Sequence, residues 1–276
     1  MPLTRRAALK GVIVTAVGAA TGAATWGIGF ERHALRLVSV ELPITNLPPA
    51  LDGLRIGFLT DVHHSETVSV DDVVRAVKIA QAASPELVVL GGDYVTWGNR
   101  AYVSPVAEML GQLSAPHGVF AVLGNHDDDR DMPSALTARH IAVLRDARTS
   151  LTIRGETLDL VGLRFWTRKA ADIAKATRGA RGTTLMLAHD PRRLVEAAEL
   201  GVPGVISGHT HGGQVVLPGV GALAARRFPV LAGIATRRRS SLFVSRGIGT
   251  VYVPVRINCP PEVAIVTLRP AAAQPA

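Results

Sequence analysis

Short apolar runs recur along the chain from residue 54 onward, and glycine and polar residues follow each of them. The runs cover residues 54–59, 87–90, 119–123, 184–187 and 205–206. Apolar runs of this length, bounded in this way, predict buried β-strands. Between the first two runs, Ser69 and Asp72 are spaced as a helical capping box ahead of apolar residues at helical spacing. Strands that alternate with helices predict βαβ units and a largely parallel sheet.

A polar cluster follows every run, where the expected strand ends. The clusters are Thr60-Asp61-Val62-His63, Gly91-Gly92-Asp93, Gly124-Asn125-His126-Asp127, Ala188-His189-Asp190 and Ser207-Gly208-His209-Thr210-His211. Ligand sites in open α/β sheets lie beyond the carboxyl ends of the strands. We therefore expect one sheet edge to gather all five clusters.

The C-terminal region has a different pattern. Apolar runs at 242–245, 250–253 and 263–268, separated by glycine and proline, predict three more strands, in a second sheet packed on the first. A strand at 158–163 and a helix at 170–177 occupy the longest interval between clusters, which leaves no room for a large cap domain. We expect a single domain over 54–270 with an open site, a linker and first strand region over 31–53, and a frayed tail over 271–276.

The N-terminus has the pattern of a targeting segment. Arg5 and Arg6 precede an uncharged run over 11–30 that is rich in Ala, Gly, Thr and Val. The paired arginines resemble a twin-arginine export signal, which implies a place in the periplasm or on the outer face of the cytoplasmic membrane. A run of about 20 apolar residues also suffices to cross a bilayer, so residues 11–30 are either a signal or an anchor. Small residues at 22–24 leave cleavage of the signal open.

Composition narrows the chemistry. Cys259 is the single cysteine, which excludes an intramolecular disulfide and a thiolate-rich metal site, so His, Asp, Glu or Asn must hold any metal. The net charge of +8 favours anionic partners such as phosphate groups or an anionic membrane surface. Aromatic residues make up only 4% of the chain, and without a recognisable binding motif nucleic acid is not an expected partner.

The clusters together supply more ligands than one four-coordinate metal ion uses. The candidates are Asp61, His63, Asp93, Asn125, His189, His209 and His211. Two ions are the economical interpretation, and four histidines favour transition metals such as Mn, Fe or Zn. A shared carboxylate holds two hydrolytic cations about 3.5–4 Å apart, and Asp93 is the candidate for this role. Each cluster alone is a common turn sequence, so the argument depends on the set.

The five motifs, in this order, resemble those of the calcineurin-like metallophosphoesterases. The resemblance covers about 150 residues and implies an α/β fold, a four-layer αββα sandwich of two mixed sheets flanked by helices. It implies one metal held by Asp61, His63, Asp93 and His211, and a second held by Asp93, Asn125, His189 and His209. It also implies that His126 stands beside the substrate as an acid or charge stabiliser. Asp127 is expected to orient the His126 ring, because carboxylates commonly orient catalytic histidines.

The function that follows is hydrolysis of phosphoester bonds. A water held between two cations has a lowered pKa, so hydroxide is available near neutral pH to attack phosphorus in line. The expected substrate is a phosphodiester of the cell envelope, linked to a lipid or a cell-wall polymer. Arg226, Arg227 and residues 237–239 either contact such an anionic partner or lie in solvated loops. The motifs around 245–249 and 254–262 resemble an exported bacterial subgroup of the family.

Two alternatives remain open on the sequence. One is a pyrophosphatase of a UDP-linked acylated sugar, as in lipid A synthesis, although an export signal disagrees with a cytoplasmic nucleotide substrate. The other is a metal-containing envelope-binding module without catalytic activity, for which His126 has no purpose.

Overall fold

Two six-stranded sheets form the centre of the molecule. The computed structural model describes residues 5–272 of the 276. The first sheet has the order β1-β14-β2-β3-β4-β5, formed by β1 (Arg36–Ile44), β14 (Glu262–Pro270), β2 (Arg55–Leu59), β3 (Leu87–Leu90), β4 (Val119–Ala121) and β5 (Ala142–Val143). The second has the order β12-β13-β9-β8-β7-β6, formed by β12 (Gly233–Arg237), β13 (Ser240–Val244), β9 (Gly204–Ser207), β8 (Thr183–Ala188), β7 (Glu156–Leu163) and β6 (Ala147–Ile153). A small hairpin, β10 (Val216–Leu217) and β11 (Gly221–Ala222), stands apart from both sheets.

Helices cover the outer face of each sheet. The first sheet carries α2 (Val70–Ala82), α3 (Val103–Leu110) and α4 (Asp131–Thr137), and the second carries α5 (Ala170–Thr177) and α6 (Leu194–Leu200). Single-turn 3₁₀ helices occur at η1 (Glu31–His33), η2 (Pro49–Leu51), η3 (Arg100–Tyr102), η4 (Pro191–Arg193) and η5 (His211–Gly213).

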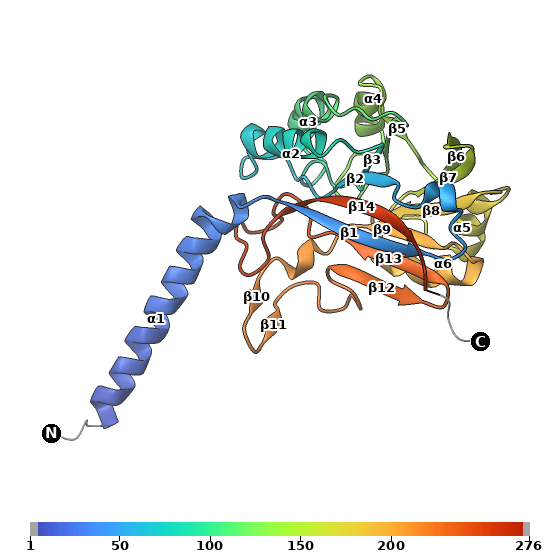
Figure 1. The fold of residues 1–276 in the computed structure, drawn as a ribbon. Helices are drawn as coiled ribbons and strands as arrows, with labels where there is room; N and C mark the ends of the chain where they lie inside the picture. The colour runs from blue at the N-terminus through green and yellow to red at the C-terminus, as the bar shows by residue number, and fades with distance from the viewer. Residues whose placement is uncertain (1–4, 273–276) are drawn as a thin grey trace.

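Three hydrophobic cores separate the four layers. Val77 and Leu110 belong to the core between the first sheet and its helices, and Ile173 belongs to the core between the second sheet and its helices. Between the sheets, the Phe58 and Phe243 rings meet edge to face with centroids 6.2 Å apart. The expected α/β sandwich is therefore confirmed (Figure 1).

Most of the predicted elements form where the pattern placed them. The capping box is present, because Ser69 Oγ accepts from the Asp72 amide while the Asp72 carboxylate accepts from the Ser69 amide. Helix α5 and strand β3 have the predicted bounds.

The C-terminal predictions need two corrections. Residues 250–253 form a loop, because Tyr252 has φ 65° and the carbonyls of Val251 and Val253 accept from the Gln214 side-chain amide and not from a strand. The last strand, β14, lies in the first sheet, parallel to β1 and antiparallel to β2. The region 31–53 therefore contributes β1 to the same sheet. The tail predicted over 271–276 lies, beyond residue 272, outside the described residues.

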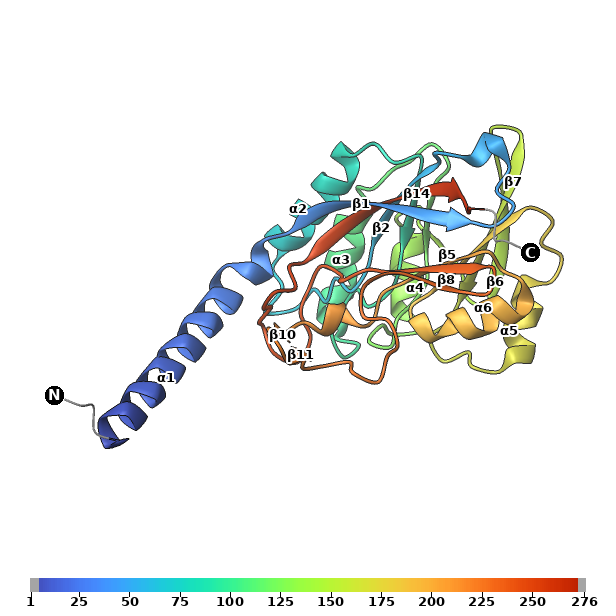
Figure 2. The ribbon, with the colours of Figure 1, turned by 60° about the horizontal axis from the view of Figure 1, so that its bottom comes forward.

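The N-terminal helix α1 (Arg5–Gly29) extends away from the domain (Figures 1 and 2). The segment Val12–His33 is almost entirely exposed, and it is long and apolar enough to cross a membrane. The end of the helix packs on the domain, since Gly27 O accepts from the Arg256 amide. Directly after it, the buried Glu31 carboxylate accepts from Trp26 Nε1 and from the Cys259 amide.

Candidate metal centre

The five polar clusters meet at the carboxyl ends of strands from both sheets. Asp61 and His63 follow β2, Asp93 follows β3, and Asn125 follows β4 in the first sheet. His189 follows β8, and both His209 and His211 follow β9 in the second sheet. The side chains of Asp61, His63, Asp93, His189 and His211 are buried, whereas Asn125 and His209 are half-buried.

The ligand atoms form two groups. Asp61, His63 and His211 make one group, and Asp93, His189 and His209 make the other, with the candidate atoms of each group within 4.8 Å of one another. Asp93 lies between the groups, because its Oδ2 is 3.1 Å from His189 Nε2 and 3.6 Å from His63 Nε2. The structure thus brings six of the seven predicted ligands together in the two sets that the resemblance implied.

The side-chain amide oxygen of Asn125 is a further candidate metal ligand. Asn125 Oδ1 is buried and has no hydrogen-bond partner among the described residues. An unpaired buried oxygen is costly unless a ligand occupies it. A set of imidazoles, carboxylates and one amide oxygen fits divalent transition metals, so the residues present are suited to the implied ions.

The backbone around the ligands is strained. Five of the predicted ligands have positive φ, at 51° for Asp61, 50° for His63, 55° for Asp93, 74° for His209 and 51° for His211. Positive φ is uncommon outside glycine, and such strain concentrates at functional sites. Hydrogen bonds maintain the conformation, since the Asp61 amide donates to Gly92 O and the His63 amide donates to Asp93 O.

Glycines let the backbone come close to the two carboxylates. A Cβ at Gly124 would lie 2.0 Å from Asp93 Oδ1, and one at Gly208 would lie 2.2 Å from Asp61 Oδ2. Any side chain at either position would displace the carboxylate from the centre.

Burial sets the protonation of most of the imidazoles. It lowers the pKa of His63 and of His209 to about 3, and it lowers the pKa of His211 well below the usual value. These rings are therefore neutral at pH 7, as metal ligation requires.

His189 differs from the other three imidazoles. Burial alone would lower its pKa, but the charges of Asp93 and Asp61 outweigh burial and raise the pKa to about 10. Its Nδ1–H donates to Gly91 O at 2.8 Å, so Nε2 faces the carboxylates. A proton on Nε2 would thus compete with a cation for this position.

The backbone amide of Trp97 orients the ring of His126. The expectation that Asp127 orients this ring is wrong. His126 Nδ1 accepts from the Trp97 amide at 3.1 Å. The Asp127 carboxylate instead accepts from the amides of Asp93, Tyr94 and Gly124 at 2.8–2.9 Å. Asp127 therefore fixes the loop that carries Asp93. Burial raises the pKa of Asp127 to about 7.

Several aromatic rings lie around the centre that the sequence did not predict there. Trp97 meets His126 with centroids 4.6 Å apart and Tyr252 with centroids 5.4 Å apart. On the other side, the Phe165 and Phe228 rings lie 5.1 and 5.0 Å from His209. Trp97 had one usable signal, its place four residues after Asp93 in the same expected loop. The others come from loops whose position depends on the complete fold.

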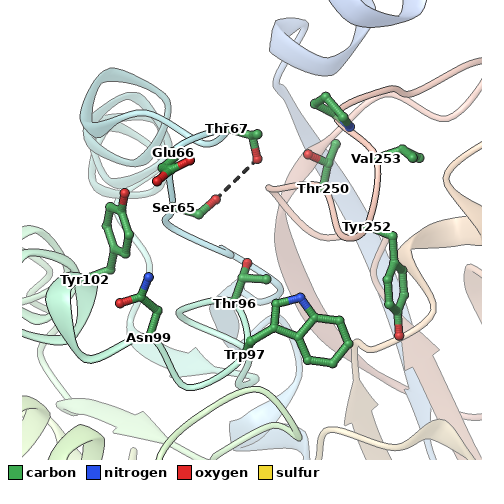
Figure 3. A pocket seen from close by; sticks show the side chains of 11 residues that line it. Ser65, Glu66, Thr67, Thr96, Trp97, Asn99, Tyr102, Thr250, Tyr252 and Val253 are labelled. Carbon is green, nitrogen blue, oxygen red and sulfur yellow. Dashed lines mark hydrogen bonds between the residues drawn. The ribbon is translucent and has the colours of Figure 1, made fainter.

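Two cavities flank the centre. The first, called here the Trp97 cavity, has a volume of about 470 Å³ and is lined by Ser65, Glu66, Thr67, Thr96, Trp97, Asn99, Tyr102, Thr250, Tyr252, Val253 and Pro254 (Figure 3). The second, called the Leu223 cavity, has a volume of about 460 Å³ and is lined by His209, Thr210, His211, Gly213, Gln214, Val215, Leu223, Ala224, Ala225, Arg226, Arg227, Phe228, Val251, Tyr252 and Val253. Tyr252 and Val253 line both cavities.

The model of the calcineurin-like phosphoesterase family matches residues 54–213, the range that contains all five clusters. This chain belongs to that family. It is accordingly a metallophosphoesterase, a hydrolase that acts on phosphoric ester bonds with divalent metal ions.

Several known proteins are similar in sequence over most of this chain. It is 26% identical to the uncharacterized metallophosphoesterase YkuE of Bacillus subtilis, over 97% of this chain and 98% of that protein. It is 29% identical to the phosphodiesterase YaeI of Escherichia coli, over 78% and 82% of the two chains. A transmembrane protein with metallophosphoesterase domain from Danio rerio is 29% identical over 96% of this chain and 63% of its own length.

Solved structures share the fold. The sulfate thiohydrolase SoxB of Thermus thermophilus superposes with a TM-score of 0.51 at 11% identity, over 80% of this chain and 58% of that one. The NAD nucleotidase NadN of Haemophilus influenzae superposes with a TM-score of 0.50 at 15% identity, over 71% of this chain and 50% of that one.

Proposed function

We propose that this protein is a dinuclear phosphodiesterase that acts on a substrate of the cell envelope. Asp61, His63, Asp93 and His211 would hold one divalent ion, and Asp93, Asn125, His189 and His209 the other, with Mn, Fe or Zn as the candidate metals. The position of Asp93 Oδ2 between the two groups supports the shared role. When bound, such ions supply a nucleophile from water at neutral pH and neutralise charge on the phosphoryl oxygens.

His126 provides the proton that the departing ester oxygen needs. A backbone amide can only donate, so the contact with Trp97 leaves His126 Nδ1 without a proton. The proton of the neutral ring is then on Nε2. In the reaction, water adds to phosphorus, one P–O ester bond breaks, the departing oxygen takes the Nε2 proton, and the proton given up by the attacking water restores the proton on Nε2.

The two cavities are the observation that carries the preference for a diester. A monoester has one organic group on its phosphate, whereas a diester has two. The two groups extend from phosphorus in different directions, and each needs space in the site. Two separate cavities adjoin the centre next to different residues: Thr96 and Trp97 of the Trp97 cavity hydrogen-bond His63 and His126, while His209 and His211 line the Leu223 cavity.

The N-terminal segment supports a place in the envelope. The segment Val12–His33 is suited to crossing a membrane by length and composition, and Arg5 and Arg6 precede it as in a twin-arginine signal. The fish relative is itself named as a transmembrane protein. We propose export through the twin-arginine route, with the catalytic domain held at the outer face of the cytoplasmic membrane.

The test compares a diester with its monoester. The full chain, purified in detergent, is assayed on bis(4-nitrophenyl) phosphate and 4-nitrophenyl phosphate with Mn, Fe or Zn, and its bound metal is measured. We expect faster turnover of the diester. Asp93→Asn should reduce kcat at least about 100-fold and lower the metal content, because it weakens both sites. Asp172→Asn, an exposed carboxylate on α5, is the matched control and should keep wild-type values.

Other outcomes would assign other functions. Turnover of a UDP-linked acylated sugar in preference to either ester would establish the pyrophosphatase. Two bound ions per chain without turnover of any ester would establish a binding module.

A further inference from the structure

We propose that the Leu223 cavity binds the hydrocarbon chain of a membrane-resident phosphodiester whose phosphate lies at the metal centre. This inference rests on the proposed function and specifies its substrate class. The lining is largely apolar, and it includes Val215, Leu223, Phe228, Val251 and Val253. Such an apolar surface suits a hydrocarbon better than a sugar or a nucleotide, because it offers few partners for their many polar groups.

The cavity is continuous with the reacting position. His209 and His211, one from each group of ligands, form part of its wall. A chain attached to the phosphate through its ester oxygen therefore enters the cavity directly from the centre. Arg226 and Arg227 also line the cavity and provide positive charge for the anionic phosphate of the same molecule.

The cavity lies at the end of the domain from which α1 departs. Both ribbon views show the β10–β11 hairpin at that end (Figures 1 and 2). Hydrogen bonds connect these parts, because the Val216 amide donates to Ile257 O and the adjacent Arg256 amide donates to Gly27 O in α1. A bilayer that holds α1 would accordingly face the hairpin and the loop at 251–254.

The rim of the cavity is suited to that contact. Leu223, Tyr252 and Val253 of the lining are exposed by 51%, 77% and 52%. Exposed apolar groups gathered in one place mark an interaction site, and tyrosine is favoured at membrane interfaces. A lipid could pass its chain from the bilayer into the cavity along this rim without crossing water.

The experiment varies one alkyl chain and keeps the reacting bond constant. The full chain in detergent is assayed with Mn on methyl, butyl and octyl 4-nitrophenyl phosphate, each below its micelle concentration. Burial of each methylene group should raise kcat/KM up to about fourfold. We expect the octyl ester to exceed the methyl ester at least about tenfold.

Variants locate the effect. Leu223→Asn and Val253→Asn, on separate segments of the wall, should each lower the octyl-to-methyl ratio at least about threefold, because an amide replaces part of the apolar surface. Both side chains are half or more exposed, so the fold should tolerate the changes. Leu200→Asn, an exposed leucine at the end of α6 outside the cavity, is the control and should keep the ratio.

The outcomes separate this inference from the proposed function. Metal-dependent turnover with equal kcat/KM for the three esters would overturn the hydrocarbon site and leave the phosphodiesterase intact. A chain-length preference that survives both wall variants would place the hydrocarbon elsewhere and likewise overturn the inference. No turnover of any ester by protein with bound metal would overturn the proposed function and this inference with it.

Discussion

The backbone around His126 determines which ring nitrogen carries the proton. Burial lowers the pKa of His126, so the ring is neutral at pH 7, and the Trp97 amide keeps Nδ1 as the acceptor. The His126 amide in turn donates to Asp93 Oδ1 at 2.8 Å, which connects the proposed acid to the carboxylate proposed to be shared by the two ions. Trp97 has φ 54°, and its unusual backbone conformation directs the amide at the ring.

A leaving-group comparison tests this role. His126→Gln should reduce kcat/KM by about 10²–10⁴-fold for a diester that releases an alkyl alcohol, because a departing alkoxide needs a proton. For 4-nitrophenyl esters the loss should stay below about tenfold, since nitrophenolate leaves unprotonated. Steady-state kinetics on the two esters give the ratio. Equal losses for both esters would show that His126 does not donate the proton.

The side chain of Asp159 connects neighbouring strands of the second sheet through hydrogen bonds. This buried residue of β7 accepts from Arg148 and Ser150 of β6 through Oδ1, and from the amides of Arg181 and Gly182, directly before β8, through Oδ2. Burial alone would raise the pKa of Asp159, but these hydrogen bonds outweigh burial and hold the pKa below its usual value.

The stability of the chain should therefore depend on pH through Asp159. A carboxylate with a lowered pKa in the folded state stabilises the protein above its unfolded pKa of about 4 and loses that effect as pH falls toward the folded pKa. Asp159→Asn should lower the free energy of unfolding by about 2 kcal/mol at pH 7. Denaturant unfolding at pH 7 and at successively lower pH measures the difference, which should shrink below pH 4. A constant difference across this range would show that the charge of Asp159 is not the cause.

Local patterns explain why many elements were predictable. Strand β3 and helix α2 follow from an apolar run and a capping box, which are signals within a few neighbouring residues. The order of the polar clusters likewise predicted which side chains meet. By contrast, the loop at 250–253 has the composition of a strand, and only the distant Gln214 side chain determines its conformation. Positive φ at Asp61 or His211 also depends on the assembled centre, so no local signal reveals it.

The C-terminal end of helix α1 is connected to the domain by close packing and hydrogen bonds. Gly27 packs so closely that an added Cβ would lie 2.6 Å from Arg256 O and 2.7 Å from a methyl group of Val255. Glu31 continues the connection to Cys259, whose thiol donates to His211 O at 3.1 Å. Helix α1 is thus connected to His211 of the candidate metal centre through Glu31 and Cys259.

Two matched glycines test this connection. Gly27→Ala should lower the free energy of unfolding by about 1–3 kcal/mol, because the methyl group overlaps backbone that cannot move freely. Gly29→Ala, two residues on and with open space around it, should leave stability unchanged or slightly improved. Denaturant unfolding of the full chain in detergent gives both values. Equal stability of the two variants would mean that the helix end does not pack as described.

The place of β14 has a consequence for biosynthesis. Glu262, its first residue, accepts from Ser245 Oγ and the Arg246 amide, and the adjacent Gly247 lies against Asp61. Strand β14, late in the described chain, therefore lies in the interior of the first sheet, and its first residue fixes the loop beside Asp61. A nascent chain cannot complete this centre before β14 has been synthesised, and a chain that stops before residue 262 should be a product that proteases remove.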